Sequence, residues 1–495
     1  MDRIFRFKPV FSLFLILMLA ISCEFADSGK LSRPNIIVFI ADDVSATDLK
    51  VYGNPIGHTP VIDSLAQNGI TFERAILTTS SCSPSRASII SGRYPHNTGA
   101  PELHTPLLPS IKTVAGDLKS SGYFVGASGK WHLGEATRKD FNTVMDTAIG
   151  PGGEDRWLEL LDSIPEQQPF FLWMASLDAH RNWDRQGHPA IPNAEAIVPP
   201  PYLVNDSLTR HDLAAYHDEI ARFDFHIGRV LNALRNTGRL ENTLVIVIAD
   251  NGRPFPRDKT RMYDSGLQTP LIVSGAGIGN RPQRSRALIS IIDLAPTLLQ
   301  IAGLPVGESY QGMSFKSVLQ NPAISHRDYV FAEHNWHDYQ AHERMVRSQE
   351  YLLIENNLPE KRQSSAADVH TGDSFKSLLQ WGLNPEAIPS EYRDHFIYPR
   401  PQYELYHTTE DPHQLHNLAE SPEYSAVLES LKQRLNNWKK ATADTPAVNL
   451  TPDHYDYYGS PLDSLKTFNS VDRGKLPGED LRASKIVSND RDLQE

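Results

Sequence analysis

The chain has 495 residues, of which 40% are hydrophobic and only two are cysteines, so its stability must come from a buried core and not from disulfide bonds. Its formal charge is −12 and its pI is about 5.9, which disfavours a nucleic-acid partner, because binding to phosphates requires a basic face. A small anionic substrate remains compatible with this charge, since a local cationic pocket can oppose the sign of the whole protein.

The N-terminus has the pattern of an export signal. Arg3, Arg6 and Lys8 precede an apolar run over residues 10–21, which is too short to span a bilayer as a mature helix. We therefore predict a signal peptide over residues 1–22. Ala20-Ile21-Ser22-Cys23 is similar to a bacterial lipobox, which predicts lipidation of Cys23, with plain cleaved secretion as the alternative. A retained N-terminal anchor is the third reading. All three readings export the protein, and under the first a lipid anchor would be its contact with the membrane.

Residues 23–32 are small and polar and form a predicted linker. Four apolar runs then predict buried strands, at residues 35–40, 123–127, 170–175 and 243–249. Polar residues follow each run: Asp42-Asp43, Lys130 with His132, Asp178 with His180, and Asp250-Asn251. Open α/β sheets place ligands at the carboxyl ends of their strands, so these residues are candidates for one site.

Helical patterns alternate with these strands, at residues 60–68, 217–234 and 293–302. The alternation predicts an α/β fold with a large, mostly parallel sheet covered by helices on both faces, in a catalytic domain over residues 33–305. Beyond residue 305 the strand-like pieces are short, and a last amphipathic helix is predicted near residues 425–440. This pattern predicts a smaller α+β subdomain over residues 306–447, followed by a polar tail over residues 448–495.

The polar residues that follow the predicted strands are compatible with a metal or anion site and also with ordinary structural roles. Asp42, Asp43, Asp250 and Asn251 offer only oxygen ligands, which suit Ca²⁺ or Mg²⁺, although helix capping and a tight turn explain the same residues. Lys130-Trp131-His132 stands in a glycine-flanked loop that could approach an oxyanion, or could be an ordinary surface loop.

The run Cys82-Ser83-Pro84-Ser85-Arg86 resembles the signature of the type I sulfatases. Further motifs follow in the order that this family shows: Ser91-Gly92-Arg93-Tyr94-Pro95, Gly129-Lys130-Trp131-His132-Leu133-Gly134, Ala249-Asp250-Asn251-Gly252 and Ile292-Asp293-Leu294-Ala295-Pro296-Thr297. The resemblance covers residues 34–438 and implies the alkaline-phosphatase-like fold.

Within the family, the chain is most similar to the branch that contains heparan N-sulfatase. The shared features are Asp178-Ala179-His180-Arg181, the run from Asp250 to Pro256, and Tyr403-Glu404-Leu405-Tyr406 near the end. Ala179 departs from the proline that is usual in that branch.

The resemblance implies that a maturation enzyme oxidises Cys82 to formylglycine. One hydroxyl of the hydrated aldehyde would attack sulfur, and the other would later expel sulfate, which an unmodified thiol cannot do. One Ca²⁺ would be held by Asp42, Asp43, Asp250, Asn251 and the group derived from Cys82. Arg86, one helical turn after Cys82, would hold the aldehyde and the carboxylates in place.

The resemblance also assigns roles around the sulfate. Lys130 and Lys259 would bind its oxygens. His180, alone or together with Lys259, would protonate the leaving oxygen or nitrogen, and His132 would accept the proton when sulfate is expelled. Three further residues are candidates for shaping the substrate pocket: Arg181, His334 and His337.

The implied substrate is a sulfated polysaccharide or its oligosaccharides. An exported bacterial enzyme favours an algal polymer such as ulvan, with glycosaminoglycan sulfatase or N-sulfatase activity as the alternative. A phosphatase or phosphodiesterase of the same superfold would need histidine-rich zinc ligands, which this ligand set lacks. A glycan-binding protein without catalysis is the other alternative, although every site position carries a competent residue.

Overall fold

The computed structural model describes residues 33–146, 150–183, 193–445 and 451–463. The predicted signal peptide, Cys23 and the end of the polar tail lie outside the described residues. Within the described ranges, we find no helix that combines the length and the apolar character needed to cross a membrane.

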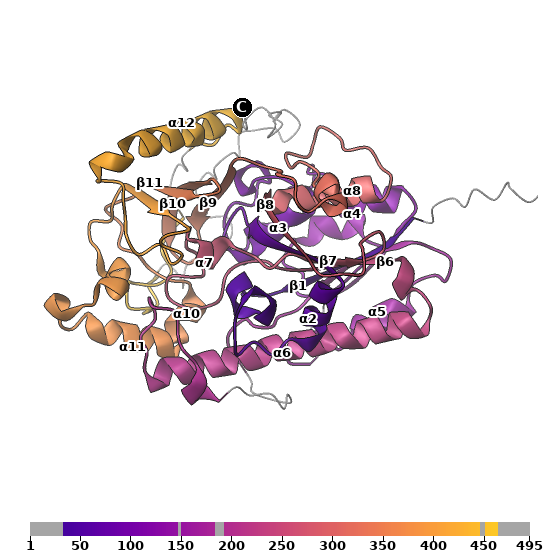
Figure 1. Cartoon of the computed structure of the whole chain (residues 1–495), viewed down its shortest axis with the longest axis horizontal. Coiled ribbons are helices and arrows are strands. Elements are labelled where there is room, and N and C mark those ends of the chain that lie inside the picture. Colours follow the sequence, from indigo (N-terminus) through magenta and orange to yellow (C-terminus); the bar gives the residue numbers. More distant parts are fainter. Residues whose placement is uncertain (1–32, 147–149, 184–192, 446–450, 464–495) are drawn as a thin grey trace, which may run out of the picture. The chain divides into compact units, whose positions relative to one another are not determined.

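Eight strands form one large sheet in the order β4-β3-β5-β1-β6-β7-β2-β8 (Figure 1). Their bounds are β1 Asn35–Ala41, β2 Gly69–Ile76, β3 Phe124–Gly129, β4 Thr143–Met145, β5 Phe170–Ala175, β6 Thr243–Ala249, β7 Ile272–Gly275 and β8 Gln283–Ser290. Neighbouring strands are parallel except at β7, which runs antiparallel to both β6 and β2. The predicted mostly parallel sheet is therefore confirmed.

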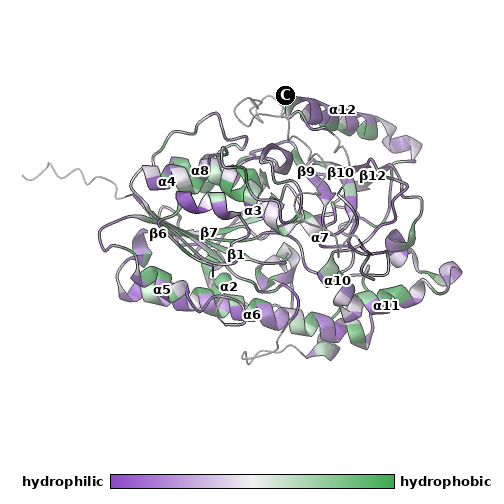
Figure 2. Ribbon diagram, turned by 180° about the vertical axis from the view of Figure 1, so that it is seen from behind, coloured by the Kyte–Doolittle hydropathy of each residue, from purple (hydrophilic) through white to green (hydrophobic). Residues whose placement is uncertain are grey.

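The large sheet is buried on both faces, because apolar side chains alternate between two cores along each central strand. In β1, Ile36 and Val38 join one core and Ile37 and Phe39 join the other. One face is covered by α3 Cys82–Ser91, α4 Val114–Ser120 and α8 Leu294–Ile301, and the other by α2 Pro60–Gln67, α5 Trp157–Asp162 and α6 Ser207–Asn236 (Figures 1 and 2). The three predicted helical patterns thus lie in α2, α6 and α8.

A second sheet is antiparallel, with four strands in the order β12-β11-β10-β9. Its strands are β9 Val330–Trp336, β10 Gln340–Arg347, β11 Tyr351–Asn356 and β12 Tyr403–His407, and the predicted last helix is α12 Ser425–Ala441. Phe331 stacks on Trp438 of α12 with ring centroids 5.3 Å apart, while Ala332 and Met345 face the core of the large sheet. The small sheet therefore lies between α12 and the first core.

Four shorter helices remain among the described residues: α7 Asp264–Leu267, between β6 and β7, and α9 Lys316–Gln320, α10 Ala367–Thr371 and α11 Asp373–Trp381 in the later part of the chain. Residues 451–463, within the predicted polar tail, pack against the small sheet and its neighbourhood. The His454 N–H donates to the Asp338 carbonyl oxygen at 2.7 Å, and the Thr451 hydroxyl donates to Glu102 at 2.7 Å.

Candidate active site

The site lies where four neighbouring parallel strands end. The order β3-β5-β1-β6 delivers Lys130 after β3, His180 after β5, Asp42 and Asp43 after β1, and Asp250 and Asn251 after β6. The backbone N–H of Asp43 donates to Asp250 Oδ1 at 3.2 Å, so the two acidic strand ends are in direct contact. The sheet thus brings together residues far apart in the sequence, such as Asn251 and Asp43, which are 208 positions apart.

The four predicted oxygen ligands are completely buried: Asp42, Asp43, Asp250 and Asn251. Asn251 Nδ2 donates to Asp43 Oδ1 at 2.6 Å, so the amide oxygen of Asn251 takes no part in this hydrogen bond. That oxygen and Asp42 Oδ1 accept no hydrogen bond within the described chain. Buried acceptors of this kind are costly unless a donor or a cation satisfies them.

A divalent cation fits this cluster. One potential ligand atom from each of Asp42, Asp43 and Cys82 lies within 4.8 Å of the others. Carboxylate and amide oxygens in this number suit a hard cation such as Ca²⁺ or Mg²⁺. The residues that would hold the ion are therefore the four oxygen ligands and the group derived from Cys82.

The ionisation of the carboxylates also favours a cation. Burial raises the pKa of Asp250 to about 7, although Arg86 opposes this shift. Burial likewise penalises the charged form of Asp42, but Lys130, His180 and Arg86 outweigh it and hold the pKa of this carboxyl below its usual range. A bound ion would therefore complete the ionisation of Asp250.

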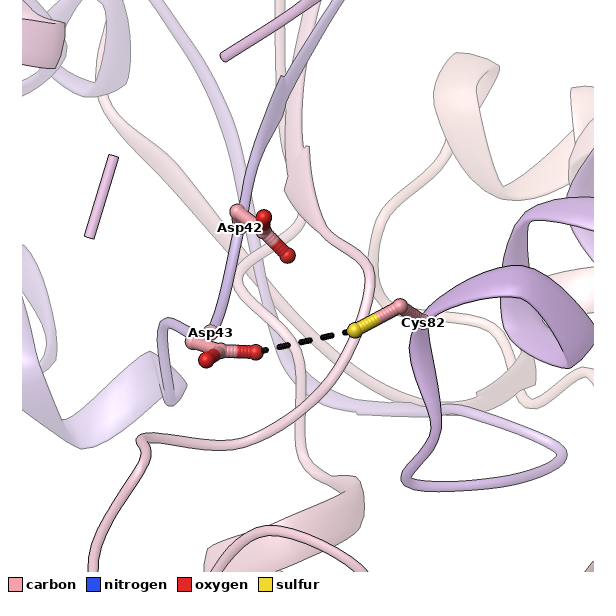
Figure 3. A group of neighbouring side chains, drawn as sticks. All are labelled: Asp42, Asp43 and Cys82. Carbon is pink, nitrogen blue, oxygen red and sulfur yellow. Dashed lines mark hydrogen bonds between the residues drawn. The ribbon is translucent and has the colours of Figure 1, made fainter. Parts of the chain in front are cut away.

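Cys82 opens α3 and points at the acidic cluster (Figure 3). Its side chain is buried, and Sγ lies 4.0 Å from Asp43 Oδ1. Burial raises the pKa of the Cys82 thiol, so the thiolate that would make it a nucleophile is disfavoured. A buried, neutral thiol is poorly suited to act as the nucleophile itself. Conversion of Cys82 to formylglycine would place an oxygen nucleophile where this sulfur lies.

Arg86 lies one turn further along α3, on the same side of the helix as Cys82. Its Nε and a terminal nitrogen each lie 2.8 Å from Asp250 Oδ2, and the same nitrogen lies 3.6 Å from Asp42. The other terminal nitrogen donates to the Lys130 carbonyl oxygen at 3.3 Å. Arg86 therefore links helix α3 to the ends of β1, β3 and β6.

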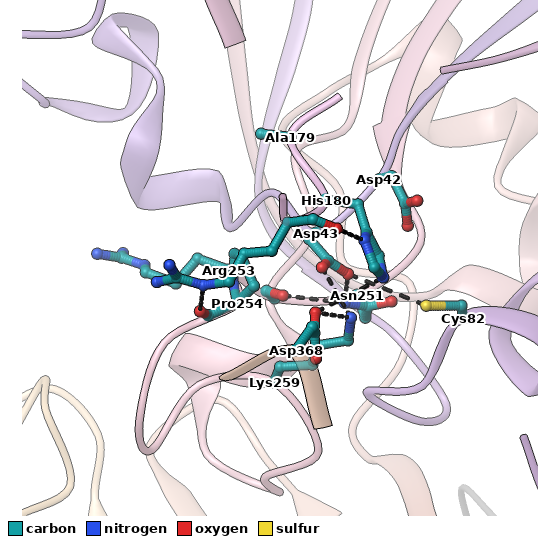
Figure 4. Close-up of polar contacts among 12 residues, drawn as sticks. Asp42, Asp43, Cys82, Ala179, His180, Asn251, Arg253, Pro254, Lys259 and Asp368 are labelled. Atoms are coloured by element: carbon teal, nitrogen blue, oxygen red, sulfur yellow. Dashed lines mark hydrogen bonds and ion pairs between the residues drawn. The ribbon is translucent and has the colours of Figure 1, made fainter. Parts of the chain in front are cut away.

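The two predicted sulfate-binding lysines lie against the acidic residues. Lys130 Nζ contacts Asp42 Oδ2, and Lys259 Nζ lies 2.7 Å from Asp43 Oδ2. Lys259 is also 2.7 Å from Asp368, which the sequence analysis did not single out (Figure 4). Asp368 lies in a polar stretch of the sequence that carries no recognisable motif, so only the folded structure shows that it belongs to the site.

His132 faces another histidine. Its Nε2 lies 2.8 Å from Nδ1 of His104, a residue that the sequence analysis missed. Burial, and then the charge of Lys130, holds the pKa of His132 well below its ordinary value. A neutral ring can accept a proton, which is the role predicted for this residue.

His180 stands between two acceptors in the same region (Figure 4). Its Nδ1 contacts the Arg181 carbonyl oxygen, and its Nε2 lies 3.6 Å from Asp368 Oδ2. About a third of its side chain is exposed, at 32%. His180 is thus held in place while part of its ring stays accessible to a substrate.

The three candidates for the substrate pocket have different environments. The guanidinium of Arg181 binds both oxygens of Asp212 at 2.7 Å and is largely buried. His334 is buried in β9, with Nδ1 3.8 Å from Glu343, while His337 Nδ1 lies 2.8 Å from the hydroxyl of Ser81, the residue before Cys82. Of the three, the fold brings His337 nearest to the start of α3, and contact with substrate stays a prediction for all of them.

Glu154 is a buried carboxyl behind the loop that carries His180. It accepts a hydrogen bond from Ser176 Oγ, next to Asp178, which Arg222 binds at 2.6 and 2.8 Å. Burial, and then the charge of Asp178, raises the pKa of Glu154 well above its usual value. The folded protein therefore binds this proton more tightly than the unfolded chain does, so stability falls as pH rises above the unfolded pKa.

Glu154→Gln is expected to stabilise the protein at pH 9 relative to wild type, by on the order of 1 kcal/mol, because glutamine cannot ionise. Near pH 4, where the carboxyl is protonated in both states, the two proteins should converge. Urea unfolding at both pH values measures the difference. The exposed Glu386→Gln is the matched control and should show no such trend. If wild type instead became more stable relative to Glu154→Gln as pH rises, the raised pKa of Glu154 would be contradicted.

A buried group at a helix start, beside an oxygen-donor cluster and two lysines, is the arrangement expected of an ester hydrolase that uses a divalent metal. Comparison with known proteins makes the class specific. The sulfatase family model matches residues 34–304, and the model described as N-sulphoglucosamine sulphohydrolase, C-terminal, matches residues 255–362. The chain belongs to the sulfatase family and is a sulfuric ester hydrolase. This family generally uses a formylglycine and a divalent metal, for which the residues described above are suited.

Several curated relatives match most of the chain. Human N-sulphoglucosamine sulphohydrolase is 29% identical over 83% of this chain and 91% of its own length. An ulvan-active sulfatase of Formosa agariphila is 28% identical over 83% of this chain and 76% of its own length. A solved structure, described as a complex with its substrate D-glucosamine-2-N,6-O-disulfate, aligns with a TM-score of 0.62 at 21% identity, covering 82% of this chain and 98% of that chain. This likeness supports the alkaline-phosphatase-like fold.

Proposed function

We propose that the protein is a carbohydrate sulfatase that releases sulfate from a sulfated algal polysaccharide such as ulvan, or from its oligosaccharides. The observation that carries the proposal is the geometry at Cys82, whose side chain points at buried carboxylates with Lys259 beside them. Similarity to ulvan-active sulfatases over most of the chain supports the polymer.

Formylglycine at Cys82 would supply a hydroxyl nucleophile, and Ca²⁺, when bound, would stabilise the negative charge that develops on the sulfate. Lys130 and Lys259 hold sulfate oxygens as point charges. His180 gives a proton to the leaving atom, and His132, kept neutral by burial, receives one later. Arg86 keeps Asp250 and Asp42 in place beneath the nucleophile.

A second candidate is a glycosaminoglycan sulfatase, acting on an N-sulfate or an O-sulfate. The match of residues 255–362 to the N-sulphoglucosamine sulphohydrolase model favours it, because this region includes Lys259 beside the site. The identities to the two kinds of relative, 29% and 28%, do not separate the candidates.

The test is sulfate release from two sets of substrates, ulvan oligosaccharides and heparan-derived oligosaccharides. The protein is co-produced with a formylglycine-generating enzyme, and conversion of Cys82 is verified by peptide mass spectrometry. Release from ulvan fragments alone supports the first candidate, and release from heparan fragments alone supports the second. Conversion without sulfate release from either set would contradict both ulvan and heparan as the substrate.

The leader supports export as a lipoprotein anchored through Cys23, with a sulfated glycan outside the cytoplasm as its partner. Cys23→Ala is expected to move the protein from the membrane fraction to the soluble fraction of the producing cell. An unchanged distribution would favour plain secretion or another form of retention.

A further inference from the structure

Asp368 is the one acidic residue of α10 (Ala367–Thr371), and it lies beyond both matched regions, which end at residues 304 and 362. Its side chain is mostly buried, with 12% exposed, and Oδ2 is 2.7 Å from Lys259 Nζ. The same oxygen is 3.6 Å from His180 Nε2 (Figure 4). Asp368 therefore contacts two of the residues expected to act on the leaving group.

The helix that carries Asp368 is held at its start. The backbone N–H of Ala367 donates to Asp338 Oδ2 at 2.9 Å. Asp338 follows His337, which contacts the residue before Cys82. The start of α10 is thus tied to the same loop that reaches the beginning of α3.

The other end of α10 is held by Arg181. This guanidinium binds Asp212 of α6, and Asp212 Oδ2 also accepts the backbone N–H of Ser374 at 3.1 Å. Gly372 packs so tightly on Arg181 that a Cβ there would lie 2.7 Å from the guanidinium carbon. Arg181 adjoins His180 in the chain, so one buried ion pair fixes both the His180 loop and the helix with Asp368.

This arrangement fixes two donors relative to each other. Lys259 Nζ bridges Asp368 and Asp43 at 2.7 Å each. The His180 ring is held between the Arg181 carbonyl oxygen and Asp368. A supporting carboxylate that orients a proton donor is a common way to make proton transfer efficient.

We propose that Asp368 is a positioning residue, which holds His180 and Lys259 in the orientation needed to protonate the sugar atom that leaves sulfate. The proposal rests on the proposed function. As the bond from sulfur to the sugar oxygen breaks, its electron pair goes to that oxygen, which takes the proton of His180, while the nucleophile derived from Cys82 takes the sulfur. A sugar alkoxide is a poor leaving group and needs this proton, whereas an aryl oxide needs it much less.

The experiment compares wild type, Asp368→Asn and Asp368→Glu as matured, calcium-loaded proteins, with kcat and KM measured separately. Asparagine has the shape of aspartate without its charge, and glutamate restores the charge. The matched control is Asp373→Asn on the adjoining α11, whose carboxylate forms only an exposed pair with Lys376 at 2.8 Å among the described contacts. Melting temperatures confirm that each variant folds.

On the sugar sulfate that wild type cleaves, we expect Asp368→Asn to lower kcat about 100-fold with KM nearly unchanged. Asp368→Glu should recover part of this loss, and Asp373→Asn should behave as wild type. On 4-nitrophenyl sulfate, the Asn variant should lose less than about 5-fold, because that leaving group needs a proton much less than a sugar alkoxide does.

Three results would overturn the proposal: an equal loss on both substrates, a loss confined to KM, or an Asp368→Glu variant no better than the Asn variant. The first indicates general support of the site, and the second indicates a sugar-binding residue. If 4-nitrophenyl sulfate is not cleaved by wild type, the kcat and KM values of the Asn and Glu variants on the sugar substrate decide. A matured wild type without activity on any sulfated sugar would instead refute the proposed function, and the inference with it.

Discussion

Cys82→Ala is expected to abolish sulfate release, with kcat falling at least about 10⁴-fold, because alanine cannot be converted to the nucleophile. The fold should survive, since the exchange removes one buried sulfur and no ion pair. Sulfate release by the matured enzyme, on the best substrate of the panel, measures the effect.

Cys82→Ser provides a second test of the same step. Serine supplies one hydroxyl and not two, so sulfate transferred to it should remain as a stable ester, visible as an added mass on the peptide. Circular dichroism and thermal unfolding check that both variants fold. A Cys82→Ala protein with wild-type turnover would disprove the mechanism outright.

Asp43→Asn is expected to remove tight calcium binding and to lower kcat at least about 100-fold. Asparagine keeps the shape of the side chain, and like aspartate it tolerates the left-handed backbone of this position, where φ is 61°. The loss of calcium binding and of kcat is therefore due to the missing negative charge of the Asp43 side chain. Metal content is measured by mass spectrometry after dialysis, and activity is measured before and after a chelator.

Thermal unfolding gives a readout of the ion that does not depend on turnover. Calcium at about 100 times its Kd should stabilise wild type by about 2.7 kcal/mol, and Asp43→Asn should show little of this gain. Asp373→Asn, a surface exchange of the same chemistry, should respond to calcium as wild type does. Purified wild type that holds zinc, and does not respond to calcium, would contradict the choice of ion.

The sequence alone predicts four strands of the large sheet and the polar residues that follow them. The runs at β1, β3, β5 and β6 are continuous and apolar because these strands are buried on both faces. The long strands β2 and β8, which contain charged residues, and the short strand β7 lack that signal. The antiparallel direction of β7 depends on pairing with β6 and β2, which no local pattern encodes.

Site residues were recognisable where a motif or a strand end marked them. Asp43 and Asn251 follow strands that are neighbours in the sheet, so their contact at 2.6 Å could be expected. His104 and Asp368 carry no such mark. Their contacts, with His132 at 2.8 Å and with Lys259 at 2.7 Å, arise because a loop and helix α10 from other parts of the chain pack against the site.

By itself, the sequence determined the α/β order of elements, the cysteine at the head of its motif and the oxygen donors that follow the strands. These features depend on short-range patterns, because burial imposes its periodicity on each strand and helix separately. Only the tertiary structure decided that Arg181 is engaged with Asp212 and that Asp368 stands against His180 and Lys259. Lys259 and Asp368 are 109 residues apart, and they meet because α11 packs against α6 and α10 packs against α11.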